Sequence, residues 1–248
     1  MTALYRLTTL ETKMFFRDKV SVFWTFLFPV LMIWIFGAMF GDQSVGPYSF
    51  SQMYVPSWIG VNIVTTSFFT LGTVLANYRE NDILRRYKAT PLQPWKILCA
   101  HTVQGTVIFA ISAILLVGFG MIVFDLELPR YPGSVLLSLV ISIAAFFPFA
   151  LFITSLAKNT QSAAAISSLF LNLMLFLSGA TFPLEMMPTV LQYVSKVLPL
   201  YYVIDLLRET WNNSTIWENG FNVGILLGIC VVSTLLASRF FRWDDGKK

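Results

Sequence analysis

Two segments of this chain carry polar and aromatic side chains at helical spacing within otherwise apolar surroundings. Positions i, i+4, i+7 and i+11 in the first segment share one helix face, as do i, i+4 and i+8 in the second. The two stripes are Asn62, Thr66, Phe69 and Thr73, and Ser168, Asn172 and Phe176. Such neutral groups suit the lining of a pathway for amphiphilic molecules. Hydrogen bonding between packed helices, worth on the order of 0.6 kcal/mol a bond, is the alternative, and both interpretations stay open.

A charged segment, residues 79–101, connects the second apolar run to the third. Ile83, Leu84 and Tyr87 give it an apolar face between charges, and Pro91 ends any helix there. A short amphipathic helix of this kind suits docking to a soluble partner. The alternative is a loop held against lipid head groups.

The chain offers little material for catalysis. It has one histidine, His101, no Gly-x-x-x-x-Gly-Lys-Ser/Thr loop for nucleotide phosphates, and no cluster of metal ligands. We therefore predict that this chain has no catalytic site, no metal and no cofactor of its own. The centres of the apolar runs also contain no acidic or basic residue, whereas ion-coupled carriers rely on such residues. Energy for any transport would then enter from outside the chain.

The composition requires a membrane protein. Hydrophobic residues make up 56% of the 248 residues, charged residues only 12%, and the mean hydropathy is +0.69. The apolar runs are continuous and about 20 residues long, which predicts membrane-spanning helices rather than strands. The predicted fold is an all-α membrane protein with six spans, at residues 22–40, 54–77, 102–124, 134–156, 163–180 and 221–241.

The distribution of positive charge predicts an orientation. Threading the six spans places all but three of the 17 Lys and Arg residues on one side, the exceptions being Arg130, Lys196 and Arg208. Positive residues are retained on the cytoplasmic side. We predict a multi-pass protein of the cell membrane with both termini in the cytoplasm. The net charge of +4 needs no nucleic-acid partner to explain it.

Two further segments are predicted to lie at the membrane surfaces. Residues 1–20 are amphipathic with a basic face, which favours an interfacial helix on anionic lipid. Residues 181–220 are too apolar for an open loop, but prolines cut them into pieces too short to span. These pieces are typical of re-entrant helices at the outer surface, and we assign Pro183, Pro199 and Tyr201 to a lid there.

The charged segment also resembles a known pattern. A Glu, then Leu-x-Arg, then Thr-Pro-Leu and an aromatic residue before Ile-Leu is similar to the loop between spans two and three of type-2 ABC (ATP-binding cassette) exporter permeases. Phe182-Pro183-Leu184 and Leu198-Pro199-Leu200-Tyr201-Tyr202 resemble the outer segment of that family. The resemblance covers the whole chain and is nearer to the drug- and amphiphile-exporting branch than to the polysaccharide branch. Asp82 departs from the pattern, since relatives commonly carry Gly at that position.

The resemblance implies a single transmembrane domain over residues 1–248, with a coupling loop at 78–101. It implies a dimer of such permeases, identical or not, and two separate ATP-binding subunits that hold ATP and Mg. Contact with the ATPase is assigned to Glu80, Arg86, Thr90, Pro91 and Leu92, with a second contact at Lys158, Asn159 and Gln161. The two polar stripes would line the path between the permeases.

Two other functions remain open from the sequence. One is a secondary carrier driven by an ion gradient, which the missing intramembrane charges disfavour. The other is a membrane sensor or immunity protein that binds a ligand without moving it, and the sequence says little against it.

Overall fold

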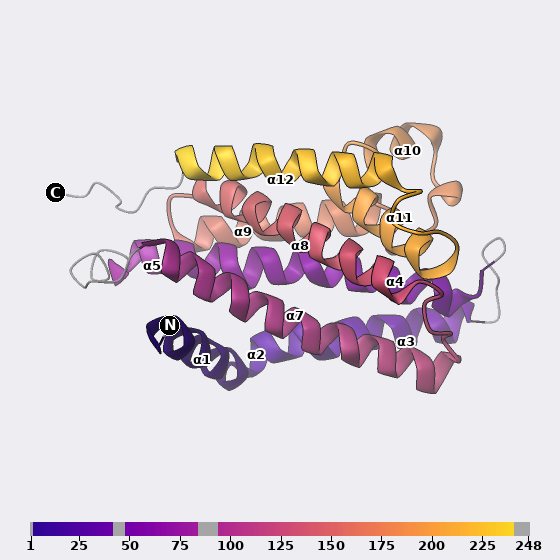
Figure 1. Ribbon diagram of the computed structural model, residues 1–248, viewed down its shortest axis with the longest axis horizontal. Coiled ribbons are helices and arrows are strands. Elements are labelled where there is room, and N and C mark those ends of the chain that lie inside the picture. Colours follow the sequence, from indigo (N-terminus) through magenta and orange to yellow (C-terminus); the bar gives the residue numbers. More distant parts are fainter. Residues whose placement is uncertain (1, 42–47, 84–93, 241–248) are drawn as a thin grey trace.

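The computed structural model describes residues 2–41, 48–83 and 94–240. Within them, six helical segments are long and apolar enough to cross a membrane, and the predicted all-α fold is confirmed (Figure 1). Two spans are composite. The first joins α2 (Lys19–Val22), η1 (Phe23–Leu27) and α3 (Phe28–Phe40), and the second joins α4 (Phe50–Thr65), η2 (Thr66–Gly72) and α5 (Thr73–Glu80). The others are α7 (Pro94–Phe124), α8 (Pro132–Ser155), α9 (Thr160–Leu177) and α12 (Gly220–Phe240).

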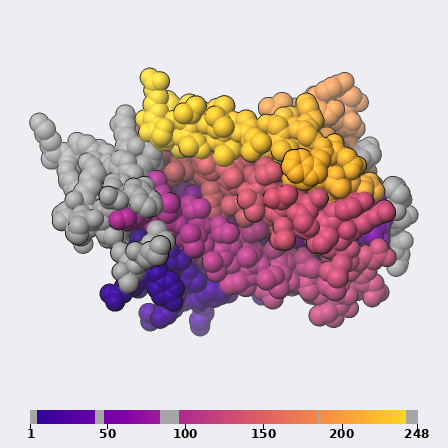
Figure 2. All heavy atoms as spheres, viewed as in Figure 1, coloured from indigo at the N-terminus to yellow at the C-terminus, as the bar shows by residue number. Residues whose placement is uncertain are grey.

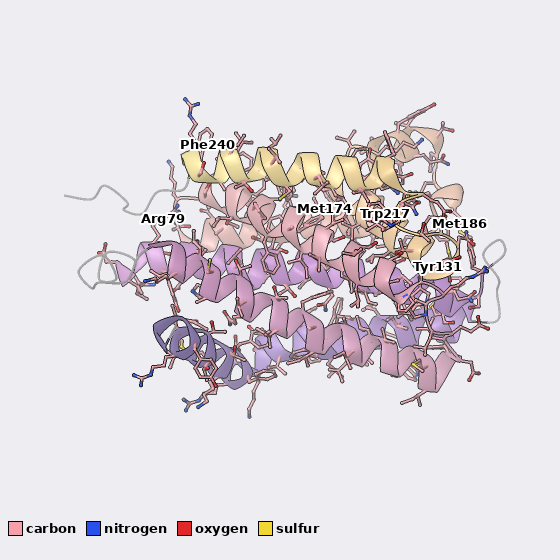
Figure 3. All side chains as sticks on the ribbon, in the orientation of Figure 1. Arg79, Tyr131, Met174, Met186, Trp217 and Phe240 are labelled. Atoms are coloured by element: carbon pink, nitrogen blue, oxygen red, sulfur yellow. The ribbon has the colours of Figure 1, made fainter. Side chains whose placement is uncertain are left out.

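The bundle has two ends of different construction (Figure 1). The start of α1 (Thr2–Arg17) lies at the same end as the close of α5 and of α12, and we name this the termini end. The short helix α10 (Thr189–Ser195) and α11 (Pro199–Asn212) lie at the opposite end, named the re-entrant end. Figure 3 shows Arg79 and Phe240 at the termini end, and Tyr131 and Met186 at the re-entrant end.

Local sequence signals set the helix boundaries. Ser49 and Gln52 form a reciprocal capping box at the start of α4, and Asn159 caps α9 by accepting from the Ser162 amide at 2.8 Å. Pro132 and Pro199 occupy the first turns of α8 and α11, where a missing amide hydrogen costs nothing. Gly179, at φ +83°, follows the end of α9 in the left-handed region that glycine tolerates.

Some boundaries differ from the sequence prediction. The second span continues through Glu80 and α7 begins at Pro94, so both ends of the predicted 78–101 loop are helical and His101 lies inside α7. The fifth span occupies residues 160–177 rather than 163–180, because Asn159 caps its start and the turn at Gly179 follows its end. Apolar composition alone marks neither feature.

The re-entrant segment is confirmed as a sharply bent pair. The axes of α10 and α11 differ by 89°, and the 3-10 turn η3 (Leu184–Met186) precedes them. One face of α11 is fully buried, including Leu200, Val203 and Leu206. A methyl group on Gly60 would lie 3.3 Å from a Val203 methyl, so glycine permits α11 to pack directly on α4.

One face of the molecule shows how the spans are layered. In Figure 2, α12 runs along one edge, beside α8 and then α7, and α1 appears at the opposite edge. Large apolar side chains remain exposed on α12, such as Val231 at 58% and Leu235 at 64%. This is the surface expected where lipid takes the place of water.

Candidate functional site

A groove of about 750 Å³ opens between the first, second and fifth spans, in the half of the bundle nearest the termini end. Its walls come from α1, α2, η1, η2, α5 and α9, with one residue each from α3, α4 and α7. This volume is in the range of small-molecule sites in proteins. The groove is the place where the structure brings part of both predicted stripes together.

The stripe of the second span is shifted from its predicted positions. Thr65, Phe69, Thr73 and Asn77 are the partly exposed residues that recur every four positions, whereas Asn62 and Thr66 are buried at 0% and 1%. The exposed set recurs every four positions through η2, a π-helical segment whose i→i+5 hydrogen bonds widen each turn. The predicted stripe therefore meets the exposed face at Phe69 and Thr73 but not at Asn62 and Thr66. Of the predicted stripe, Phe69 lines the groove.

Asn62 instead joins three helices. Its Nδ2 donates to the Thr25 carbonyl at 2.9 Å and to Ser112 Oγ at 2.9 Å, and Ser112 Oγ donates to the same carbonyl at 3.0 Å. Pro29 lacks the amide hydrogen that would normally reach the carbonyl four residues earlier, which is that of Thr25. Asn62 and Ser112 therefore donate the hydrogen bonds that the Thr25 carbonyl cannot receive from Pro29.

The fifth span contributes two of its three predicted residues. Ser168 and Asn172 line the groove, and Asn172 Nδ2 also donates to the Ser168 carbonyl at 2.8 Å. Phe176 is 50% exposed and lies outside the groove lining. Thr73 also lies outside it, and its hydroxyl donates to the Phe69 carbonyl at 2.7 Å.

A carboxylate from α1 reaches the groove wall. Glu11 is only 5% exposed, and Tyr78 Oη donates to its Oε1 at 2.5 Å. Gln104 Nε2 donates to the Glu11 backbone carbonyl at 3.1 Å, which ties α1 to α7. Glu11, Tyr78 and Gln104 all line the groove. They are not among the site residues predicted from the sequence, although Glu11 is the one acidic residue of α1.

Asp18 marks the break between α1 and α2 and also lines the groove. Its carboxylate accepts from the Ser21 hydroxyl at 2.5 Å and from the Val20 amide at 3.1 Å. The Ser21 hydrogen bond lowers the pKa of Asp18 below its usual value. Asp18 is therefore ionised at neutral pH.

The two predicted coupling segments meet at the termini end. The Glu80 carboxylate accepts from the Thr160 backbone amide at 2.7 Å and from the Thr160 hydroxyl. Thr160 begins α9, directly after Asn159 and between the predicted residues Lys158 and Gln161, both of which are exposed. Glu80 thus stabilises the first turn of α9, where a carboxylate is favourable.

Arg79, next to Glu80, fixes the same junction from inside. It is 6% exposed, and its guanidinium donates to the carbonyls of Ser155 and Ala157 at the close of α8 (Figure 3). The end of the second span is therefore bound to the turn between α8 and α9 by two adjacent side chains. Arg86, Thr90, Pro91 and Leu92 lie outside the described residues.

The predicted lid residues lie at the re-entrant end of the bundle. Pro183 is buried, Pro199 starts α11 and Tyr201 is partly exposed. The residue that organises this end is Arg208, which donates to the Met53 carbonyl at 3.2 Å, Ser57 Oγ at 2.8 Å and the Gly179 carbonyl at 2.8 Å. Arg208 is one of three positive residues that fall on the outer side in the predicted topology, and that rarity is a signal for it in the sequence.

The groove and the junction at the termini end offer hydrogen-bonding and apolar side chains. Among the described residues, no group of three or more His, Cys, Asp or Glu side chains could hold a metal ion. A family model described as ABC-2 type transporter matches residues 2–211. The chain belongs to the ABC-2 type transporter family. The predicted resemblance is thereby confirmed, and the chain is a transport component with several membrane-spanning helices.

Relatives in this family are named for transport. The chain is 25% identical over 222 residues to the putative transport permease YvfS of Bacillus subtilis, covering 86% of this chain and 90% of the relative. It is 28% identical over 193 residues to nodulation protein J of Rhizobium meliloti, covering 75% and 73%. It is 26% identical over 156 residues to the probable multidrug ABC transporter permease YbhR of Escherichia coli, covering 62% of this chain and 40% of the relative.

Proposed function

We propose that this chain is the permease subunit of an ATP-driven exporter that moves hydrophobic or amphiphilic molecules out across the cell membrane. The observation that carries the proposal is the groove between the first, second and fifth spans of an ABC-2 chain. It combines apolar and aromatic walls with the amide and hydroxyl groups of Asn172 and Ser168. A relative named as a probable multidrug permease supports export.

Energy enters at the termini end in this proposal. The family assignment supports a separate ATP-binding subunit, in two copies, that holds ATP and Mg. The bias of Lys and Arg supports a cytoplasmic position for this end. The hydrogen bonds from Thr160 to Glu80 connect the two segments assigned to ATPase contact. A displacement of either segment by the ATPase would therefore move both the second and the fifth spans. Those spans form two walls of the groove.

A second permease chain, identical or different, completes the pathway in this proposal. The differential affinity of the ATPase for two arrangements of the paired permeases drives the cycle. Lys158, Asn159 and Gln161 form the smaller contact beside the main coupling segment, and Pro183, Pro199 and Tyr201 close the outer end.

The test is to extract the tagged chain gently from its native membrane and identify by mass spectrometry what co-purifies. We expect a stoichiometric subunit with a Gly-Lys-Ser/Thr phosphate loop. Inside-out vesicles that hold the complex should take up an amphiphilic dye with ATP and not with a non-hydrolysable analogue. Uptake that needs no ATP and stops with an ionophore would identify an ion-driven carrier. Ligand-dependent partner binding with no flux would identify a sensor.

A further inference from the structure

We infer that the groove selects organic cations, meaning amphiphilic molecules that carry a positive charge beside aromatic or aliphatic surface. This inference rests on the proposed function and names the substrate class of that same groove. Nothing in the family assignment or in the names of the relatives specifies a charge. The charged, aromatic and amide side chains of the groove wall support the cation preference.

The charge of the wall is of one sign. Glu11 and Asp18 are the charged side chains among the residues that line the groove, and both are carboxylates. Glu11 lies within α1, and Asp18 lies at the break between α1 and α2. A cation in the groove would be attracted by both, and the attraction is stronger near the buried Glu11 than in bulk water. An anion of the same shape would be repelled.

The aromatic side chains suit the same ligand. Trp24, Phe28 and Phe69 line the groove, and the Trp24 and Phe28 rings lie 4.8 Å apart, centre to centre. Faces of Trp and Phe attract cations through their quadrupoles, with Trp the strongest. These rings also supply apolar area for the uncharged part of the molecule. The groove therefore offers charge attraction and apolar contact within one volume of about 750 Å³.

The hydrogen bonds that hold the carboxylates keep them in place without removing their charge. Tyr78 donates a neutral hydroxyl to Glu11, and Ser21 donates a neutral hydroxyl to Asp18. A neutral donor orients a carboxylate and leaves its negative charge available for a ligand. The Ser21 bond also lowers the pKa of Asp18, so protonation does not cancel that charge at neutral pH.

The experiment compares two ions of the same shape and opposite charge. Tetraphenylphosphonium and tetraphenylborate each have four phenyl groups around one central atom. Binding of each is measured by equilibrium dialysis against the full chain in nanodiscs of zwitterionic phosphatidylcholine, with empty nanodiscs as the baseline. We expect the phosphonium to bind at least about tenfold more tightly than the borate.

Two variants remove charge and keep the hydrogen bonds. Asp18→Asn retains a side chain that caps the start of α2, and Glu11→Gln retains an oxygen that accepts from Tyr78. We expect each to weaken phosphonium binding by roughly three- to tenfold and to leave borate binding the same or tighter. Asp125→Asn is the matched control, because Asp125 lies after α7 and outside the groove lining, and its φ of +48° suits Asn.

The inference is overturned if the two ions bind equally, if neither exceeds the empty nanodiscs, or if Asp125→Asn weakens the phosphonium as much as Asp18→Asn. Since Glu11→Gln alters a buried contact, Asp18→Asn at the exposed break gives an independent result. The proposed function fails in a distinguishable way. Should the complex export a neutral amphiphile with ATP and not the phosphonium, the exporter stands and the cation preference falls. When no ATPase co-purifies and no ATP-dependent flux occurs, the exporter itself falls.

Discussion

The two halves of the second span have opposite surroundings. From Phe50 to Val64 the helix is regular and almost wholly buried, with Gln52 and Met53 the only partly exposed residues. From Thr65 to Glu80 the span passes through the π-helical segment η2, and its partly exposed side chains Thr65, Phe69, Val74 and Asn77 line the groove. One continuous helix thus serves as core at one end and as the wall of a site at the other.

The difference between the halves lies in what covers them. The first half is covered by α11, which Gly60 admits at close range. Arg208 of α11 donates to the Met53 carbonyl and Ser57 Oγ of this half and to the Gly179 carbonyl beyond α9. The second half faces α1 and η1 across the groove. Tight interior packing makes substitutions costly in stability, whereas residues around a cavity repack more freely. Substitutions in the two halves should therefore separate stability from binding.

Arg208→Met should have the largest effect on stability. The change removes three hydrogen bonds from a charged donor and leaves the carbonyls of Met53 and Gly179 without that partner. We expect a loss of about 3 kcal/mol in the free energy of unfolding, because bonds to charged groups are the stronger class. Thermal unfolding in mild detergent, followed by tryptophan fluorescence, would measure it.

Arg130→Met is the control for Arg208, since Arg130 belongs to the same predicted outer side and lies between α7 and α8. Its ring contact is a cation–π contact with the neighbouring Tyr131 at 5.6 Å. We expect a loss below about 1 kcal/mol for this exposed contact. Equal losses in the two variants would contradict the view that Arg208 holds the re-entrant end together.

Asn62→Leu and Asn172→Leu make the same chemical change in the two settings. Asn62 bridges to Thr25 and Ser112 in the interior, so its loss should cost about 1 kcal/mol, near the value of two interhelical bonds. Asn172 lines the groove and bonds within its own helix, so its replacement should leave the melting temperature nearly unchanged and alter ligand affinity. If Asn62→Leu instead alters ligand affinity and leaves the melting temperature unchanged, the predicted pathway role of Asn62 would be supported.

The architecture was accessible from the sequence because bilayer thickness and continuous apolar runs constrain it. The six spans, the bent pair and the family follow from patterns tens of residues long. The exposed face of the second span was only partly accessible from the sequence. Asn62 and Thr66 are polar but buried, and nothing in the residue types of Thr66 to Gly72 marks the π-helical segment that runs through this part of the span.

The groove residues that come from distant segments of the chain could not be predicted from the sequence either. Glu11 enters the groove only because α1 packs against α7, and no local pattern indicates which helix an amphipathic segment will meet. Asn62 was selected for its polarity, but its role depends on Pro29, 33 positions earlier in the chain. Only the tertiary structure shows which side chain donates to the carbonyl that a proline leaves without its helical partner.

Glu80→Ala should have a smaller effect on stability and a specific effect on coupling. Glu80 is exposed, and its bonds to Thr160 act at a helix start, where losses are typically about 1 kcal/mol. In the proposed complex, we expect ATP hydrolysis to lose its stimulation by substrate while basal hydrolysis remains. A double-mutant cycle with Thr160→Val would test the pair, and additive effects would exclude a direct coupling between the two side chains.

Phe69→Ala should change stability least and binding most selectively. Phe69 is partly exposed on the groove wall, so removal of its ring vacates little packed core, and we expect a loss below about 1 kcal/mol. Phosphonium affinity should fall about three- to tenfold, because a ring face and its apolar area leave the site together. Phe176→Ala is the matched variant on the fifth span, since Phe176 is 50% exposed and outside the groove lining. If both substitutions weaken the phosphonium equally, the ligand occupies a wider surface than the groove, and the open half of the second span loses its special role.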